Sequence, residues 1–215
     1  MKKFEEDMRK VVNNTCDMGS LAVSLLKDSV SALTDDDTEK AQSVIDRFDR
    51  ITYYDGLIEE DAIRILTLYQ PTAIDIRTLS TILKSITYME RTAKNCKNTA
   101  KAELILHETK HNQIPEIEEM GRIAIEMIEI SVNGFRNKSV EGFDRLRTLD
   151  DRLDALRNSS LADGVAFIEK DPQETASYLQ SITVSRYLER IGDQACKIAE
   201  KVTYMVCGKH VEIDT

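Results

Sequence analysis

The stretch Tyr187-Leu188-Glu189-Arg190-Ile191-Gly192-Asp193 decides the fold, because a similar stretch lies 99 residues before it. The earlier stretch reads Tyr88-Met89-Glu90-Arg91-Thr92-Ala93-Lys94, and both fall early in a long segment with helical spacing of apolar residues. Internal similarity at a fixed separation is typical of a duplicated structural unit. The sequence therefore predicts two copies of one unit, with the two quoted stretches in equivalent helices.

Apolar residues repeat with the period of an α-helix along most of the chain, and no segment alternates with period two for long enough to form a strand. Pro71, Pro115 and Pro172 each begin a periodic segment. A helix tolerates proline at its start, because the first-turn N–H groups have no partner within the helix. We predict an all-α protein with six long helices, over residues 4–33, 37–69, 72–106, 115–137, 140–169 and 173–207.

The six helices divide equally between the two copies, so the predicted architecture is two tandem three-helix bundles. The first repeat covers residues 1–106, a polar junction covers 107–114, and the second repeat covers 115–215. Because three helices alone bury a limited apolar face, we expect one continuous six-helix core rather than two independent domains.

Composition narrows the class of protein. The chain has 215 residues, of which 41% are hydrophobic, so it can build a core and wholesale disorder is excluded. Its 38 acidic and 29 basic residues give a net charge of −9, which argues against binding to nucleic acid. No run of 18 uncharged apolar residues is present, so we expect no membrane insertion.

The N-terminus and the cysteines indicate a cytoplasmic protein. The first seven residues turn acidic at once and lack the apolar region of a secretory signal. Cys16, Cys96, Cys196 and Cys207 have no C-x-x-C spacing, and we interpret them as reduced thiols. A zinc site built from Cys196 and Cys207 is the alternative.

Motifs in three regions resemble those of one known family. Phe4-Glu5-Glu6-Asp7-Met8 opens the first helix, Gln70-Pro71-Thr72-Ala73-Ile74-Asp75-Ile76-Arg77 opens the third, and Leu188-Glu189-Arg190-Ile191-Gly192-Asp193 lies in the last. Together they resemble the PhoU family of phosphate-signalling proteins, over nearly the whole chain. The resemblance implies a pair of three-helix bundles, homodimerisation, and negative regulation of phosphate uptake and the phosphate-starvation response. It also implies two partners, the ATPase of the phosphate transporter and a sensor histidine kinase.

The same resemblance implies iron or zinc sites on the bundle surface, held by Glu/Asp-x-x-x-Asp motifs of neighbouring helices. In the second repeat the matching residues are Asp150 and Asp154 on one helix and Glu189 and Asp193 on the next. Residues i and i+4 share a helical face, so each pair offers two carboxylates to one ion. Carboxylates suit hard cations and iron. Counting 100° per residue from the apolar stripe, we expect both pairs to be open to solvent.

The first repeat departs from this pattern. Lys94 occupies the position that matches Asp193, and Phe48 and Thr52 match Asp150 and Asp154, with some freedom because Asp46, Asp49 and Asp55 are near. Glu90 alone is clearly retained. We expect Lys94 to pair with Glu90 at i,i+4. The predicted metal cofactor is therefore confined to the second repeat, with the first site lost or much weakened.

Some motifs have a structural interpretation, with contact to a partner protein as the alternative for Asp75 and Arg77. Acidic i,i+4 pairs are common on solvated helical faces. Asp75 suits the first turn of its helix, Arg77 is expected to pair across helices, and Arg91 and Arg190 are expected to form salt bridges within the bundle.

The run His107-Glu108-Thr109-Lys110-His111 matches the H-E-x-x-H pattern of zinc peptidases, with Glu129 as a conceivable further ligand. Lys110, the nearby Pro115 and the absence of a third histidine at metzincin spacing count against a peptidase. Adventitious metal binding by the His pair is what remains. No nucleophile elbow, Walker loop or dinucleotide fingerprint is present. We therefore predict a non-enzymatic adaptor. The alternatives are an accessory protein of a phosphate symporter with the same fold, and a helical protein that stores or senses metal.

Overall fold

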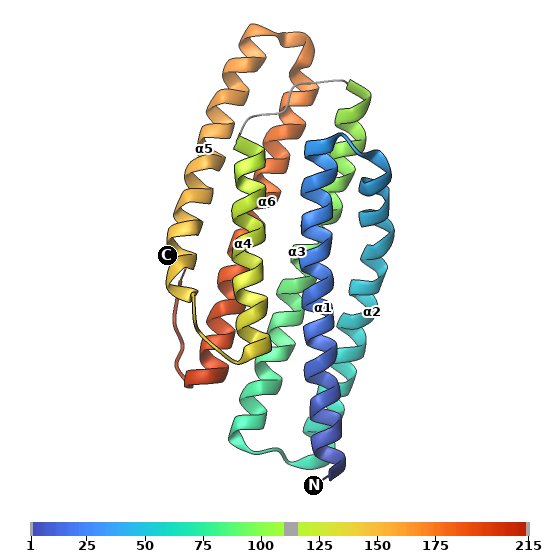
Figure 1. Cartoon of the computed structure of the whole chain (residues 1–215), viewed down its shortest axis with the longest axis vertical. Coiled ribbons are helices and arrows are strands. Elements are labelled where there is room, and N and C mark those ends of the chain that lie inside the picture. Colours follow the sequence, from blue (N-terminus) through green and yellow to red (C-terminus); the bar gives the residue numbers. More distant parts are fainter. Residues whose placement is uncertain (1, 110–115, 214–215) are drawn as a thin grey trace.

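The computed structural model describes residues 2–109 and 116–213 and confirms six long helices. They lie roughly parallel to one long axis, and the two chain halves are side by side (Figure 1). The helices are α1 (Lys2–Asp35), α2 (Thr38–Tyr69), α3 (Ala73–Thr109), α4 (Glu116–Asn137), α5 (Leu146–Lys170) and α6 (Thr175–Cys207), with short 3-10 turns η1 (Phe143–Arg145) and η2 (Pro172–Glu174). The described residues contain no strand.

Local sequence explains where the helices begin. The Asp37 side chain accepts a hydrogen bond from the backbone N–H of Lys40 at 2.9 Å and caps the start of α2. Asp75, in the first turn of α3, accepts bonds from the backbone N–H and the hydroxyl of Thr72 at 3.1 and 2.6 Å. This confirms the structural role predicted for Asp75. The fifth helix begins later than the predicted residue 140, because Lys138 and Gly142 adopt left-handed backbone conformations, with φ of 49° and 82°.

The start of α3 lies beside the end of α6, so these two helices run antiparallel. Helix α6 ends at Gly208, whose φ of 69° is a left-handed conformation that favours glycine. The Nη1 atom of Arg77 lies 2.6 Å from where a Cβ on Gly208 would be. No ion pair within 4.0 Å joins Arg77 to an acid in the described chain, so the predicted cross-helix pairing is wrong. Its charge instead lies at the negative end of the α6 dipole.

One apolar core runs through both halves, as expected. The pair α3 and α6 has the most extensive interhelical contact, and α1 also packs on α4 across the halves. Buried residues from all six helices join in a single cluster, which includes Leu25, Ile51, Leu79, Met120, Leu153 and Leu188. Across residues 2–109 and 116–213, no helix combines the length and apolar character needed to cross a bilayer.

The α1–α4 contact is reciprocal. A Cβ on Gly19 would lie 2.9 Å from Val132, and a Cβ on Gly121 would lie 2.6 Å from Val30. Gly121 and Val132 each follow their counterparts by 102 residues. Equivalent residues thus meet in both directions, as at the interface of a two-fold dimer. The two repeats are therefore packed as an internal pseudo-dimer, with glycine permitting close approach.

Replacing Gly121 with alanine should lower the free energy of unfolding by about 1–3 kcal/mol, because the added methyl group overpacks against Val30. The matched control is Gly56→Ala in α2, where nothing lies within 4 Å of the new Cβ. That change should stabilise the protein by up to about 1 kcal/mol through helix propensity. Urea unfolding of the two variants measures both effects, and equal responses would contradict the close-packed interface.

Candidate functional site

The four predicted ligands lie on two helices that pack against each other. Asp150 and Asp154 are on α5, and Glu189 and Asp193 are on α6. Gly192 lets the helices approach closely, since a Cβ there would lie 2.6 Å from Leu153 and 3.4 Å from Asp150 Oδ1. The site therefore begins at a tight helix–helix contact.

Asp150 lies inside this contact rather than in solvent. Its exposed fraction is 8%, whereas Asp154 is exposed and Glu189 and Asp193 are half-buried. The prediction that both pairs are open to solvent is thus wrong for Asp150. The helical wheel assumed one packing face, but α5 packs on both α4 and α6. Asp150, which lies off the centre of the apolar stripe of α5, is therefore covered by a neighbouring helix.

Asp154 on α5 and Glu189 on α6 are near enough for their charges to interact, and we refer to them as a facing pair. Partial burial raises the pKa of Glu189, and the negative charge of Asp154 raises it further. Arg157, Arg190 and Arg186 oppose these effects without cancelling them. A cation bound beside Glu189 would favour its charged form and offset the repulsion from Asp154.

Asp193 also has neighbours on α3. It lines a groove of about 370 Å³ between α3 and α6, together with Arg91, Lys94, Asn95, Asn98, Arg190 and Gln194. Arg91 and Arg190 come from the two equivalent stretches and are exposed there. Neither makes an ion pair within 4.0 Å in the described ranges, contrary to the predicted bundle salt bridges. Asp193 is thus an acid in a largely cationic groove.

The first half retains a facing pair that the sequence comparison missed. Partial burial raises the pKa of Asp55, and the charges of Glu90 and Glu59 raise it further. Asp55 and Glu90 stand 99 residues before Asp154 and Glu189. Identification of Glu90 as the only retained acid is therefore incomplete. The freedom noted in placing the α2 residues was the one available signal for Asp55.

The residues first matched to the second-half acids take other roles. Phe48 packs beneath the Lys97 ammonium, which lies 4.4 Å from its ring centroid, and Thr52 is exposed. Among the described residues, Glu90 and Lys94 are not within ion-pair distance, so the predicted i,i+4 pair is not formed. Lys94 instead lines the α3–α6 groove with Asp193.

The second-half acids suit a hard cation or iron by donor chemistry, because Asp154 and Glu189 supply carboxylate oxygens whose repulsion an ion would relieve. They are not gathered into a finished cage. In the described part of the chain, the group of three or more ligating side chains within 4.8 Å of one another is Asp36, Glu103 and His107. Iron or zinc at the α5–α6 site stays a prediction.

The other candidate metal motifs are only partly covered by the described residues. His107 is near the end of α3, and His111 lies outside the described residues. Glu129, the conceivable further peptidase ligand, pairs with Lys27 at 2.5 Å. All four cysteines are thiols rather than disulfides, and Cys196 is buried while Cys207 is exposed.

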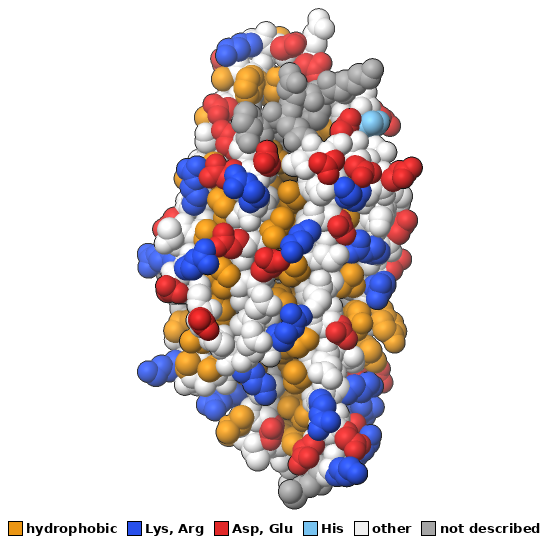
Figure 2. Space-filling model, in the orientation of Figure 1, with side chains coloured by type: hydrophobic (Ala, Val, Ile, Leu, Met, Phe, Trp, Pro, Cys, Tyr) orange, Lys and Arg blue, Asp and Glu red, His pale blue; other side chains and the backbone are white. Residues whose placement is uncertain are grey.

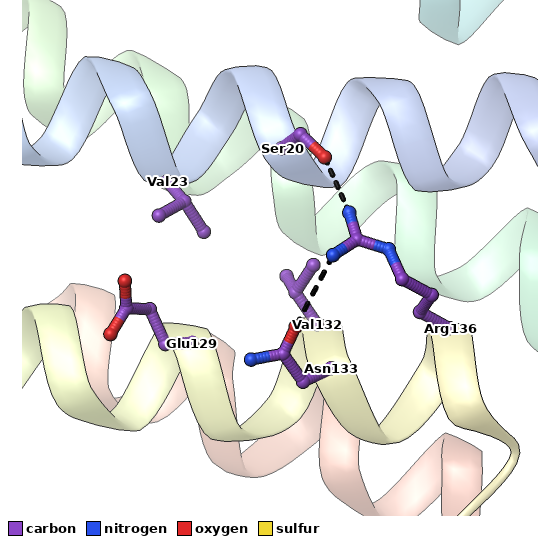
Figure 3. A pocket seen from close by; sticks show the side chains of 6 residues that line it. All are labelled: Ser20, Val23, Glu129, Val132, Asn133 and Arg136. Carbon is purple, nitrogen blue, oxygen red and sulfur yellow. Dashed lines mark hydrogen bonds between the residues drawn. The ribbon is translucent and has the colours of Figure 1, made fainter.

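A small pocket lies between α1 and α4, where the two halves meet. Its volume is about 190 Å³, and Figure 3 shows the lining residues Ser20, Val23, Glu129, Val132, Asn133 and Arg136. Arg136 donates hydrogen bonds to Ser20 at 2.5 Å and to Asn133 at 3.3 Å. Acidic and basic side chains are interspersed over this face (Figure 2). The pocket is therefore bridged by its own side chains.

Replacing Asp154 with asparagine should lower the pKa of Glu189, because the change removes the negative charge that raises it. Carbon-detected NMR titration of the side-chain carboxyl measures the shift. Asp151→Asn, at an exposed neighbour on α5, serves as the control and should leave Glu189 unchanged. Equal titration of Glu189 in both variants would contradict the facing arrangement.

Known proteins match this chain over nearly its whole length. The family model described as PhoU domain matches twice, over residues 15–102 and 117–202. A Clostridium acetobutylicum protein named phosphate-specific transport system accessory protein PhoU homolog is 29% identical over 215 residues, which cover 99% of this chain and 98% of that protein. The Escherichia coli (strain K12) protein named phosphate-specific transport system accessory protein PhoU is 24% identical, covering 96% and 86%.

Two solved structures share the fold. The crystal structure of PhoU from Pseudomonas aeruginosa matches with a TM-score of 0.90 and 30% identity, covering 96% of this chain and all of that one. The phosphate transport system regulatory protein PhoU from Streptococcus pneumoniae matches with a TM-score of 0.86 and 22% identity, covering 97% and 99%. The second likeness concerns the fold alone.

Proposed function

The chain belongs to the PhoU family, and from that premise we propose that it is an accessory regulator of phosphate transport. The observation that carries this proposal is the end-to-end match to the Clostridium acetobutylicum protein named as a phosphate-transport accessory protein. Both repeats are covered, so the shared unit is the whole pseudo-dimer. The proposed role is negative regulation of phosphate uptake and of the phosphate-starvation response, by binding and without a reaction of its own.

The proposed partners are the ATPase of the phosphate transporter and a sensor histidine kinase, in the cytoplasm. Exposed apolar side chains near both ends of the bundle support protein contacts, because such residues are favoured where another protein covers them. Leu68 and Ile74 flank the α2–α3 turn with exposed fractions of 64% and 65%. Leu161 and Val165 lie near the α5–α6 turn, at the opposite end of the molecule (Figure 1), with exposed fractions of 44% and 50%.

Iron or zinc at Asp150, Asp154, Glu189 and Asp193 is part of this proposal. The facing repulsion of Asp154 and Glu189 supports it. A bound ion would neutralise these acids and hold α5 against α6, which changes the charge of the surface offered to a partner. We further propose that the protein forms a homodimer. Light scattering, which measures molecular mass in solution, tests this directly.

The test is capture of the purified transporter ATPase by the immobilised full chain, with iron, with zinc and with a chelator. We expect capture, and absence of capture in all three conditions would refute the transporter role. Two matched variants locate the contact: Leu68→Lys with Ile74→Lys at one end, and Leu161→Lys with Val165→Lys at the other. We expect one of them to reduce capture at least about tenfold, since a charge placed in an apolar interface is costly. Unchanged capture by both would refute contact through the apolar ends.

A further inference from the structure

Three metal-ligating side chains meet at a place that the proposed function does not use. Asp36, Glu103 and His107 each offer one ligand atom, and these atoms all lie within 4.8 Å of one another. Asp36 lies in the turn between α1 and α2, and the other two lie near the end of α3. The group is in the first repeat and shares no residue with the α5–α6 acids.

The backbone brings these side chains together. Glu103 and His107 are four residues apart on α3, so they occupy one face of the helix. Asp36 has a φ of 55°, a left-handed conformation that is uncommon for a residue with a side chain. The Asp37 backbone N–H donates to the Ala32 carbonyl at 2.9 Å, which closes this turn. His107 Nδ1 then lies 2.7 Å from Asp36 Oδ1. The left-handed conformation of Asp36 thus places its side chain next to the imidazole of His107 and the carboxyl group of Glu103.

Glu103 is the member that needs explanation. It is 1% exposed, and its Oε1 has no hydrogen-bond partner among the described residues. Leaving a buried carboxylate oxygen unsatisfied costs stability, as does burying the charge. Burial and then the neighbouring Asp36 raise the pKa of Glu103 to about 8. Glu103 therefore has unmet acceptor capacity at Oε1, and one of its carboxylate oxygens lies within 4.8 Å of the ligand atoms of Asp36 and His107.

We propose that Asp36, Glu103 and His107 form a binding site for a divalent transition metal ion of the Zn²⁺ or Fe²⁺ type. One imidazole and two carboxylates are a donor set that such ions accept, with water completing the coordination. The ion satisfies the buried Glu103 oxygen and compensates the two acids. It ties the α1–α2 turn to α3, so it acts as a clamp within the first repeat. The site is independent of the proposed transport function.

The test uses the full chain, stripped with a chelator, in which Asp154→Asn and Glu189→Gln remove the second-half acids. Calorimetric titration with Zn²⁺ should then show binding that His107→Asn and Glu103→Gln each weaken at least about tenfold, as loss of a ligand requires. His210→Asn is the matched control, because His210 lies beyond the end of α6, where it stacks on the ring of Tyr204. It should leave the affinity unchanged. Zn²⁺ affinity unaffected by both His107→Asn and Glu103→Gln would overturn the site.

A second measurement guards against variants that fail to fold. In the chain with native His107 and Glu103, Co²⁺ should broaden the imidazole NMR signals of His107 at concentrations that leave those of His210 sharp. The three histidines of the chain make the assignment by single substitution practical. Equal broadening of His107 and His210 would mean nonspecific binding only, and would refute the clamp.

Discussion

Replacing Glu103 with glutamine should raise the free energy of unfolding of the metal-free protein at pH 9 by roughly 2–4 kcal/mol. Glu103 is buried, and its pKa is raised from 4.5 to about 8, first by burial and then by Asp36 and Asp37. At pH 9 the native protein must therefore hold a buried negative charge beside other acids. Glutamine fills a similar volume, carries no charge and can donate a hydrogen bond to Asp36.

The direction of this pH dependence follows from the number of protons that the folded and unfolded chains bind at Glu103. Between about pH 4.5 and 8, the folded chain keeps the Glu103 proton while the unfolded chain has released it. The stabilising effect of that proton is fully present below pH 4.5 and is lost as the pH rises through 8. Urea unfolding in chelator at pH 5, 7 and 9 should show this loss in the native sequence and not in Glu103→Gln. Glu108→Gln, at an exposed neighbour on α3, is the control and should keep the native slope. A native slope in Glu103→Gln would contradict the prediction.

Neutralising Asp154 and Glu189 should weaken iron or zinc binding by the second half at least about tenfold, because it removes the facing oxygens that a cation compensates. The equivalent change in the first half, Asp55→Asn with Glu90→Gln, should have little effect. There Lys94 takes the place of Asp193 and puts an ammonium group near the ion. Calorimetric titration of the two double variants measures the difference.

Both double variants need His107→Asn in the background, so that the Asp36–Glu103–His107 group does not contribute. Circular dichroism should confirm that each retains its helices. Equal losses of affinity in the two halves would mean that the repeats bind metal alike, and would refute the asymmetry. No metal binding by the background protein would refute the second-half site itself.

Helix content and duplication follow from the sequence, because apolar spacing and prolines depend on residues close in the chain. The start of the fifth helix shows where prediction from apolar spacing fails. Its periodic pattern extends back to residue 140, yet the left-handed conformation of Gly142 delays the helix to Leu146. Turn conformation near a helix end depends on which neighbours the turn must reach. Phe143, for example, packs against Gly134 of α4.

The site was predictable in residue type but not in exposure. The α6 stretch with Glu189 and Asp193 is recognisable in sequence, and an i,i+4 pair on one helix needs no tertiary information. The burial of Asp150 could be known only from the tertiary structure, because it depends on the close approach of α5 to α6 at Gly192. The role of Asp55 also required the tertiary structure, because the register between two antiparallel helices decides which of their residues face each other. A shift of three residues in the alignment of the two repeats was enough to favour Thr52 over Asp55.

By itself, the sequence determined six amphipathic helices, their division into two similar halves, and the acids that α5 and α6 carry. Those properties arise within single helices, where spacing alone places a side chain on a face. Only the tertiary structure decided that Asp154 faces Glu189, that Asp193 enters a cationic groove, and that Asp36 meets Glu103 and His107. Residues about 70 positions apart are brought together by packing of α1 and α2 on α3, which no local pattern encodes.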